Sequence, residues 1–360
     1  MCALNEVKGM DDFMKKVLVG MSGGVDSSVS ALLLKQQGYE VIGATMNLFN
    51  TETSSKDAKE VCDSLNITHV DIDYSDEFKK CVINNFISEY SNCKTPNPCV
   101  MCNKKLKFGY LYDYVKENNI DYIATGHYAK VEYSDKYKRY VLKKADNRNK
   151  DQSYFLYVIN KDMLDKIIFP LSKFNTKDEI RDIARKNNLK TASKSDSQDI
   201  CFIPDGNYKN FLENNSNLKE NIGDIILNGK VIGKHTGLYK YTIGQRKGLG
   251  IAHETPLYVI GFNKLKNELI VGEEKDLYTS SFKVKDYNLL LIDKLDGEMK
   301  VMVRPRYKSK EYKATISMDN DLINVVFDTP QKGITPGQSA VFYIDDIVVG
   351  GGIISGGFYE

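Results

Sequence analysis

The chain has 360 residues, of which 42% are hydrophobic and 27% are charged, so it is long enough for about two or three folded domains and is not disordered throughout. Its 50 Lys and Arg side chains are balanced by 48 Asp and Glu, and the resulting net charge of +2 excludes a uniformly basic nucleic-acid-binding protein but not local basic patches. No apolar run is long enough to span a membrane, and the first sixteen residues contain acids and no apolar core of a signal peptide. We therefore expect a cytoplasmic protein with no membrane anchor.

The first half of the chain alternates strand and helix patterns after an expected N-terminal extension, 1–15. Short apolar runs predict strands at 16–21, 40–46, 69–73 and 121–126. Helical patterns are found at 27–37, 56–65, 75–90, 103–118 and 177–187. Strands joined through helices predict a parallel sheet with helices on both faces, whose ligands bind beyond the carboxyl ends of the strands. We expect this parallel-sheet domain to span 16–207.

From about residue 208 onward the pattern changes to short alternating runs punctuated by glycine. Such runs include GDIILNGKVIG, GLYKYTIGQRKGLGI, PLYVIGF, NELIVGE, KVMVRPRY, YKATISM, INVVF and SAVFYIDDIVVGGGII. Helical periodicity is nearly absent, which predicts small β domains. The expected fold class is therefore an α/β parallel-sheet domain followed by two small β-rich domains, a central one at 208–278 and a barrel-like one at 279–360.

The strongest motif is SGGVDSS at 22–28, between a predicted buried strand and a helix. Its glycines let the backbone approach a phosphate group, the serines and the helix N-terminus supply donors, and Asp26 offers a carboxylate to Mg²⁺. It lacks the lysine of a Walker loop. The motif resembles the pyrophosphate-binding loop of the adenine-nucleotide α-hydrolase (PP-loop) superfamily, whose members cleave ATP to AMP and pyrophosphate and adenylate an oxygen of the substrate.

Seven cysteines, an odd number in a large chain, do not indicate a secreted disulfide framework. Cys102 opens the predicted helix 103–118 beside Lys104 and Lys105, and a thiol just before a helix N-terminus has a lowered pKa. Cys201 lies far along the chain in a polar loop. Two such thiols beside a nucleotide site suit a sulfur relay, in which one carries a persulfide and the other resolves it by forming a disulfide. For Cys201 alone, a buried cysteine in the apolar run ICFI is the alternative.

Read together, these segments closely resemble the family of bacterial tRNA-specific 2-thiouridylases, over essentially the whole chain from residue 16. The motifs that carry the resemblance are GMSGGVDSSV, TPNP-x-x-x-CN-x-x-x-KF, ATGHYA, KDQSYFL, SQDICFI, YTIGQRKGLG and the Arg-Tyr pair at 306–307. The resemblance implies ATP-dependent 2-thiolation of the wobble uridine of tRNA. Uridine O2 is adenylated, and sulfur from a cysteine persulfide then displaces AMP.

The resemblance also implies roles for individual residues and partners. Cys102 corresponds to the nucleophile or resolving thiol, and Cys201 to the persulfide carrier. The implied ATP-binding residues are Gly20, Met21, Ser22, Gly23, Gly24, Val25, Asp26, Ser27, Met46 and Gly126. The target base would lie at Asn97, Pro98 and Cys99. The implied tRNA-binding residues are His127, Lys150, Asp151, Gln152, Arg306, Tyr307 and Gln338, although His127 is as easily a structural histidine. The implied partners are tRNAs for lysine, glutamate and glutamine, and a cysteine desulfurase or sulfur-relay protein that donates the persulfide.

One position departs from the family pattern. Many members carry an acid where this chain has Cys99, so the role of that acid cannot be transferred. Besides the persulfide relay, Cys99, Cys102 and Cys201 suggest a 4Fe–4S cluster with one open iron, and a zinc site that includes Cys93 is a third alternative.

Two stretches of the chain are locally basic. Seven Lys and Arg lie between 136 and 150, interleaved with Tyr137 and Tyr140, and the alternation of Arg304, Arg306, Lys308 and Lys310 predicts one basic face of a strand. Next to a thiolation site we expect both to contact tRNA, against the alternative of a solvated charged surface. Two other functions stay open: a small-molecule ligase of the same superfamily, and a non-catalytic tRNA-binding protein.

Overall fold

The computed structural model of the chain describes residues 14–49, 52–194 and 200–355. Most of the expected N-terminal extension and residues 197–199 of the SQDICFI motif lie outside this part. Among the described helices, none has the length and apolarity needed to cross a membrane.

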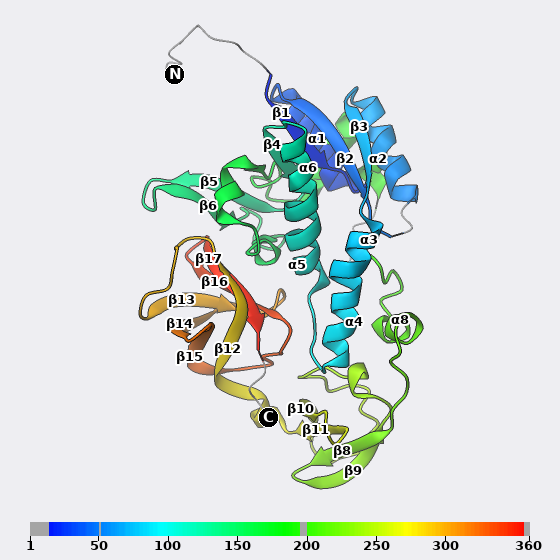
Figure 1. Cartoon of the computed structure of the whole chain (residues 1–360), viewed down its shortest axis with the longest axis vertical. Helices are drawn as coiled ribbons and strands as arrows, with labels where there is room; N and C mark the ends of the chain where they lie inside the picture. Colours follow the sequence, from blue (N-terminus) through cyan, green and yellow to red (C-terminus); the bar gives the residue numbers. More distant parts are fainter. Residues whose placement is uncertain (1–13, 50–51, 195–199, 356–360) are drawn as a thin grey trace.

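A five-stranded parallel sheet in the order β3-β2-β1-β4-β7 forms the N-terminal domain (Figure 1). The strands are β1 Lys16–Gly20, β2 Glu40–Asn47, β3 Thr68–Asp73, β4 Tyr122–Thr125 and β7 Ile167–Ile168. β1 is the central strand, and its residues Val17, Leu18 and Val19 have no exposed surface. A continuous apolar run is expected of a parallel strand that is covered on both faces. The predicted parallel-sheet domain is confirmed.

Alternate side chains of β1 enter two different cores, so helices cover both faces of the sheet. Val17 and Val19 pack with apolar residues of α1 Val25–Gln36, α2 Glu52–Ser64 and α7 Lys177–Lys186. Leu18 packs on the other face with residues of α6 Leu111–Glu117. This arrangement leaves the carboxyl end of β1 free to continue into the SGGVDSS loop.

Two longer helical segments connect the sheet to the rest of the molecule. The first consists of α3 Ser75–Phe78, a π-helical turn Lys79–Ile83 and α4 Asn84–Ser91. The second consists of α5 Pro98–Cys102, a π-helical stretch Asn103–Tyr110 and α6. The predicted start at residue 103 is wrong, because Asn97 accepts a hydrogen bond from Val100 N (3.3 Å) as the N-cap and Pro98 occupies the first helical position. Cys102 therefore lies one turn inside the helix.

The central region begins with a helix that the sequence did not indicate, α8 Tyr208–Asn215. Leu212 of α8 packs against Phe86 and Phe202, which ties this helix to α4. A four-stranded sheet follows in the order β10-β11-β8-β9. Its strands are β8 Gly223–Leu227, β9 Lys230–His235, β10 Tyr258–Asn263 and β11 Glu268–Gly272. The run GLYKYTIGQRKGLGI forms turns and a short 3₁₀ helix, Leu238–Lys240, rather than a strand, and several of its glycines have positive φ.

The C-terminal region forms a closed six-stranded barrel in the order β12-β15-β14-β13-β16-β17, because β12 also pairs with β17. This confirms the predicted barrel. The strands are β12 Tyr278–Leu289, β13 Met299–Arg304, β14 Tyr312–Asp319, β15 Leu322–Lys332, β16 Ser339–Ile344 and β17 Ile347–Ile354. A hairpin from the N-terminal half, β5 Ala129–Ser134 and β6 Arg139–Lys144, joins the same sheet through the pair Ile347 and Lys143.

The predicted basic face on a strand at 304–310 is wrong. β13 ends at Arg304, and Pro305, which has no N–H to donate to a sheet, begins an irregular loop. Arg306, Lys308 and Lys310 therefore lie in a loop rather than on alternate positions of one strand face.

Candidate active site

The SGGVDSS loop follows β1 and leads directly into α1. Gly23 has φ +70°, a conformation that favours glycine, and Gly24 is the N-cap of α1 without a side-chain hydrogen bond to the helix. The first amide groups of α1 therefore have no side-chain cap, and the positive end of the helix dipole faces the same place. Ser27 Oγ accepts a hydrogen bond from Ser22 N (3.2 Å) and stabilises the turn. The loop has the geometry of an anion site.

Asp26 is held by residues from two other elements. Lys177 Nζ, at the start of α7, lies 2.6 Å from both carboxylate oxygens, and the Tyr128 hydroxyl donates to Oδ1 at 2.8 Å. The Asp26 side chain is 31% exposed. It can serve as the single protein carboxylate of an Mg²⁺ ion held mainly by phosphate oxygens, provided that Lys177 moves to a phosphate.

Gly126 packs tightly against the loop from the end of β4. A Cβ atom built there would lie 2.9 Å from Ser27 N and 3.0 Å from the Asp26 backbone carbon. We expect Gly126→Ala to push the loop out of place, to lower the free energy of unfolding by about 1–3 kcal/mol and to weaken ATP binding. Equilibrium unfolding in urea and ATP titration measure both effects. Gly20→Ala is the control, because its Cβ would meet neighbours at an ordinary 3.7 Å; equal effects in both variants would contradict the prediction.

The segment before the SQDICFI motif is tied to the same loop. Lys194 Nζ donates to Gly23 O at 2.9 Å and is paired with Asp57 of α2. Sequence reasoning missed Lys194, although its place before the motif was a usable signal. Met46, near the end of β2, is half-buried between two apolar clusters, so it lies at the same edge of the sheet as the loop.

The expected target-base segment, 95–99, is fixed by the C-terminal barrel. Gln338 Nε2 donates to Thr95 O (2.8 Å) and Pro96 O (3.2 Å), and Thr95 N donates to Pro336 O (2.9 Å). Gln338, expected to contact tRNA, is thus engaged in holding this segment in place. Asn97 and Pro98 in turn start the helix that carries the thiols.

Cys99, Cys102 and Cys201 come together from two segments. Cys99 and Cys201 are exposed and Cys102 is half-buried, and all three are free thiols. The three thiols interact electrostatically. The charges of Cys99 and Cys201 raise the pKa of Cys102, and the charge of Cys99 raises the pKa of Cys201. Burial is the larger cause and raises the pKa of Cys102 to about 12. The expected lowered pKa of Cys102 is therefore wrong, because the thiol lies inside the helix, where burial prevails.

The cation that opposes this effect is Lys107, which sequence reasoning missed. It lowers the pKa of Cys99, Cys102 and Cys201, whereas the exposed Lys104 and Lys105 are not among the causes. Lys107 follows Cys102 by five residues along a π-helical stretch. A π-helical turn is wider than an α-helical turn and brings residues five apart to the same side, so the spacing of the two residues was the usable signal.

Metal ligation is not supported by this arrangement. In residues 14–49, 52–194 and 200–355, no three His, Cys, Asp or Glu side chains are placed to hold a metal ion. Among the described residues, the three thiols as placed do not fit the expected iron–sulfur cluster or a zinc site.

His127 is buried and fully bonded. Lys107 Nζ lies 3.4 Å from Nε2, and Thr125 Oγ1 lies 2.7 Å from Nδ1. Because a lysine only donates, Nε2 accepts and Nδ1 carries the proton, so the ring is neutral. Burial and, secondarily, Lys107 hold the pKa of His127 well below its usual range. His127 therefore accepts a hydrogen bond from Lys107 and holds this lysine, which acts on the thiols, in place. With only 9% of its surface exposed, His127 offers little surface to tRNA.

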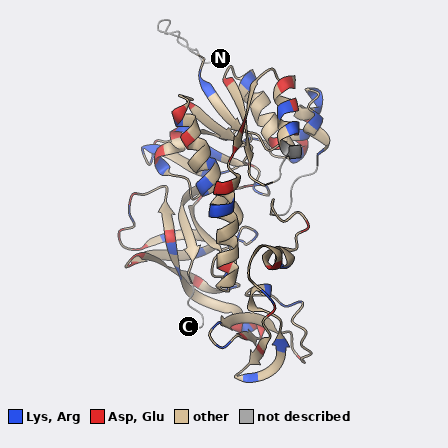
Figure 2. Cartoon of the chain, turned by 45° about the vertical axis from the view of Figure 1, so that its right-hand side comes forward, with Lys and Arg blue, Asp and Glu red and all other residues tan. Residues whose placement is uncertain are grey.

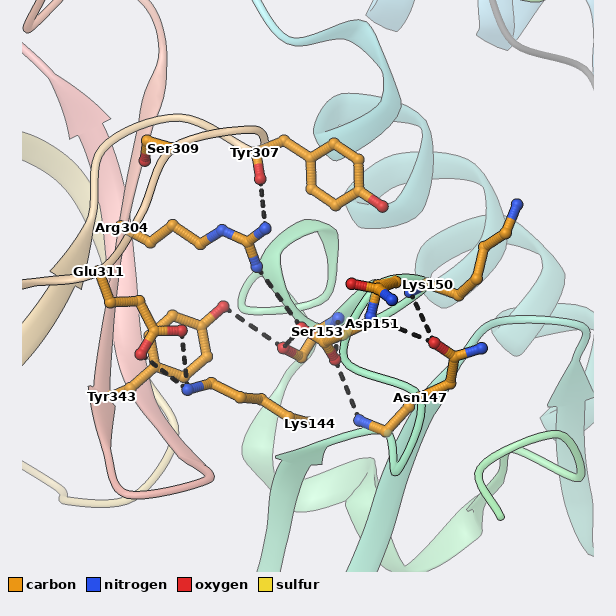
Figure 3. A network of polar contacts seen from close by, with 12 residues as sticks. Lys144, Asn147, Lys150, Asp151, Ser153, Arg304, Tyr307, Ser309, Glu311 and Tyr343 are labelled. Atoms are coloured by element: carbon orange, nitrogen blue, oxygen red, sulfur yellow. Dashed lines mark hydrogen bonds and ion pairs between the residues drawn. The ribbon is translucent and has the colours of Figure 1, made fainter. Parts of the chain in front are cut away.

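Asp151, expected to contact tRNA, lies inside the joint between the N-terminal domain and the barrel (Figure 3). It accepts hydrogen bonds from Ala145 N (3.0 Å) and Ser153 Oγ (2.8 Å) and lies 3.6 Å from Arg304. Its side chain is 2% exposed, and burial raises its pKa. Gln152 Oε1 next to it accepts from Tyr128 N (3.0 Å), so both residues hold the loop after β6 in place.

Arg306 and Tyr307 belong to the same joint. Arg306 donates to Ile243 O of the central region (3.1 Å) and bonds Thr335 of the barrel. The Tyr307 ring packs on Phe155 with centroids 4.3 Å apart. These positions of the family pattern link the three regions of the chain.

The basic stretch 136–150 is largely neutralised. Five of its seven cations pair with carboxylates: Lys138 with Asp135, Arg139 with Asp293, Lys143 with Glu132, Lys144 with Glu311 and Arg148 with Asp346. Along the ribbon in Figure 2, Lys and Arg positions are accordingly interspersed with Asp and Glu positions. This stretch attaches the hairpin to the barrel more than it offers free charge.

A different set of lysines lies on the two segments that meet at Phe155. Asn103 Nδ2 donates to Phe155 O (3.1 Å), and Tyr307 packs on the Phe155 ring, so the helical segment at Asn103 and the loop 305–311 meet there. These two segments carry exposed lysines without a carboxylate partner among the described residues: Lys104, Lys105, Lys308 and Lys310. We call them the Phe155 lysines. They come from two domains, and two of them belong to the helical segment that carries Cys99 and Cys102.

We expect Lys107→Met to slow alkylation of Cys102 by iodoacetamide at pH 8 and to move the pH profile of the reaction to higher pH. Loss of the cation raises the thiol pKa, and each added unit lowers the thiolate fraction about tenfold. Peptide mass spectrometry of the alkylated protein measures the rate. Lys105→Met is the control, and an unchanged profile in Lys107→Met would show that Lys107 does not act on the thiols.

Known proteins match the chain along nearly its whole length. The family models of a tRNA methyl transferase HUP domain, a tRNA methyl transferase PRC-barrel domain and an aminomethyltransferase β-barrel domain match residues 15–205, 209–273 and 279–354. A tRNA-specific 2-thiouridylase of Caldicellulosiruptor saccharolyticus is 45% identical over 355 residues, which cover 94% of this chain and 98% of that protein. Proteins of the same name from Acetivibrio thermocellus (45% identical; 94% and 99% covered) and Halothermothrix orenii (45%; 96% and 100%) are similarly close.

Proposed function

The chain belongs to the tRNA-specific 2-thiouridylase family of tRNA sulfurtransferases, and we propose that it converts the wobble uridine of tRNA to 2-thiouridine with ATP and a cysteine persulfide. The observation that carries this proposal is the meeting of three free thiols at the start of α5, in a domain that also presents an uncapped helix N-terminus after a glycine-rich loop. We assign both chemical steps to residues 16–207.

In the first step the SGGVDSS loop binds the phosphates of ATP. The N-terminal amides of α1 and Lys177 supply positive charge, and Asp26 would hold the Mg²⁺ that accompanies ATP and neutralises phosphate charge. Uridine O2 attacks the α-phosphate, and pyrophosphate leaves. Adenylation is needed because O2 is otherwise a poor leaving group.

In the second step sulfur reaches C2 of the activated base. A persulfide on the exposed Cys201 is accessible to a donor protein such as a cysteine desulfurase. The Cys102 thiolate attacks Cys201 Sγ, forms a disulfide with it and releases the terminal sulfur, which adds at C2 and displaces AMP. Lys107 favours the thiolate forms that this exchange requires.

The Phe155 lysines support tRNA as the substrate. Two of them come from the helix that carries Cys99 and Cys102 and two from the barrel loop 305–311, so a nucleic acid bound to all four would span the two segments that meet at Phe155. Insertion of an anticodon base requires that it be splayed out of its stack. We assign the C-terminal domain, 279–360, to tRNA binding, and the tRNAs for lysine, glutamate and glutamine as the substrates.

The test is mass spectrometry of nucleosides from tRNA incubated with the protein, ATP and a persulfide donor. Formation of 2-thiouridine that requires ATP supports the proposal, and its absence in the presence of persulfide-loaded protein would overturn it. Pyrophosphate exchange with and without tRNA distinguishes the small-molecule ligase, which does not need tRNA, from the non-catalytic binder, which shows no exchange. Iron content of anaerobically purified protein tests the cluster alternative independently.

A further inference from the structure

Cys99 has no part in the two-thiol relay. Its side chain is exposed, belongs to none of the apolar clusters and makes no hydrogen bond that the described residues show. Helix capping here depends on Asn97 and Pro98, so neither packing nor capping requires a cysteine at residue 99. The exposed thiol of Cys99 therefore has no structural role among the described residues.

The helix places Cys99 within bonding range of Cys102. The two residues are separated by one turn of α5, Pro98–Cys102, and face the same side of the helix. A rise of 1.5 Å per residue on a helix of 2.3 Å radius separates their Cα atoms by about 5 Å. Disulfides span Cα distances of roughly 4.4–6.8 Å, so the Cα separation permits a bond once the helix turn adjusts to bring the two Cβ atoms from about 5–6 Å to about 4 Å.

Cys99 is also coupled to Cys201. The charges of the three thiols influence one another in every pairing, and Lys107 acts on all of them. Cys99 is more exposed than Cys102, so an external reductant reaches it more readily. The three side chains thus form a series of thiols that leads from the half-buried Cys102 to solvent.

We propose that Cys99 is a third thiol of the sulfur-transfer cycle, which attacks Cys102 Sγ in the Cys102–Cys201 disulfide and moves the disulfide to the helix pair Cys99–Cys102. The inference rests on the proposed thiolation. The Cys102–Cys201 bond breaks and the Cys99–Cys102 bond forms, and Cys201 leaves with the electron pair and takes up a proton. No net oxidation occurs in this exchange.

The consequence is that Cys201 is free for the next persulfide before the enzyme is reduced. A dithiol reductant then supplies two electrons and two protons to the Cys99–Cys102 disulfide through the exposed Cys99 and is itself oxidised to a disulfide. Sulfur loading and reduction thereby occur at different thiols.

The test begins with full-length protein loaded with glutathione persulfide and freed of excess reagent. One turnover on tRNA and ATP is run anaerobically without reductant, then quenched with iodoacetamide and mapped by non-reducing peptide mass spectrometry. We expect a Cys99–Cys102 disulfide and an alkylated Cys201. A Cys102–Cys201 disulfide with alkylated Cys99 would overturn the inference.

The variant Cys99→Ser separates this inference from the function on which it rests. We expect the Cys102–Cys201 disulfide to accumulate after a single turnover, and the steady-state rate with a dithiol reductant to fall at least several-fold more than the single-turnover yield of 2-thiouridine. Cys81→Ser, a half-buried thiol on the π-helical turn before α4, is the control and should match the unmodified protein. An undiminished steady-state rate in Cys99→Ser rejects the inference alone, whereas failure of the unmodified protein to make 2-thiouridine rejects the proposed function as well.

Discussion

Cys201→Ser is expected to lower 2-thiouridine formation by roughly 10³-fold or more, because a serine oxygen cannot carry the transferable sulfur of a persulfide. The fold should be unaffected. Cys201 is exposed, while the neighbouring Phe202 and Ile203 are buried against Phe86 and anchor the segment. Adenylation does not involve the thiol, so pyrophosphate release from ATP in the presence of tRNA should persist. Nucleoside mass spectrometry and a pyrophosphate assay on the same reaction measure the two steps separately.

Cys81→Ser serves as the control for this prediction too, since it removes a thiol outside the site at the same cost in volume. Full thiolation by Cys201→Ser would contradict the relay. Loss of both steps would point to a structural role of the segment instead, which the unfolding free energy of the variant would reveal.

The parallel sheet was predictable because its signals are local. A buried strand such as β1 appears as a continuous apolar run, and the helices between strands exceed the length of a turn. The β-rich character of the barrel was predictable because short alternating runs punctuated by glycine are also a local signal. The attachment of the barrel to the β5–β6 hairpin was not predictable, since the strand pairing of Ile347 with Lys143 and the ion pairs around it join residues that are far apart in the sequence.

The sequence indicated which cysteines to consider, but it did not indicate where Cys102 lies in its helix or the direction of its pKa shift. The helix signal Asn97-Pro98 was present in the sequence, and reading it as an N-cap followed by a first-turn proline would have placed Cys102 inside the helix. The raised pKa of Cys102 was not predictable, because it depends on burial by distant segments. The sequence singled out the three cysteines that the structure brings together, but it did not indicate the burial that raises their pKa values.

Charge patterns were misleading for a related reason. The cations at 136–150 are partly neutralised by Asp293, Glu311 and Asp346, which lie more than a hundred residues away in sequence. Sequence shows the cations of a patch but not the acids that fold against them. The unpaired Phe155 lysines became identifiable only once Phe155 was seen to join two domains.

Asp26→Ala is expected to reduce ATP-dependent adenylation, and with it thiolation, by about 10²–10³-fold, the scale seen when a preorganised group that stabilises transition-state charge is removed. The variant lacks the only carboxylate of the SGGVDSS loop and leaves Lys177 without that partner. Persulfide loading of Cys201 should be unchanged, because Asp26 is not among the groups that influence this thiol. The loss should therefore appear in pyrophosphate exchange and in 2-thiouridine, but not in alkylation-based measurement of the persulfide.

Two comparisons decide whether this loss is chemical or structural. Asp63→Ala removes an exposed aspartate of α2 in the same domain and should leave adenylation intact. Asp26→Asn keeps the side-chain volume and the oxygen that accepts from Tyr128, but it is a weaker ligand for Mg²⁺. We expect it to retain near-normal stability towards urea and still to lose adenylation, with partial recovery at high Mg²⁺. Full adenylation by Asp26→Ala would exclude Asp26 from ATP activation, and equal loss of stability and activity in Asp26→Asn would make its contribution structural.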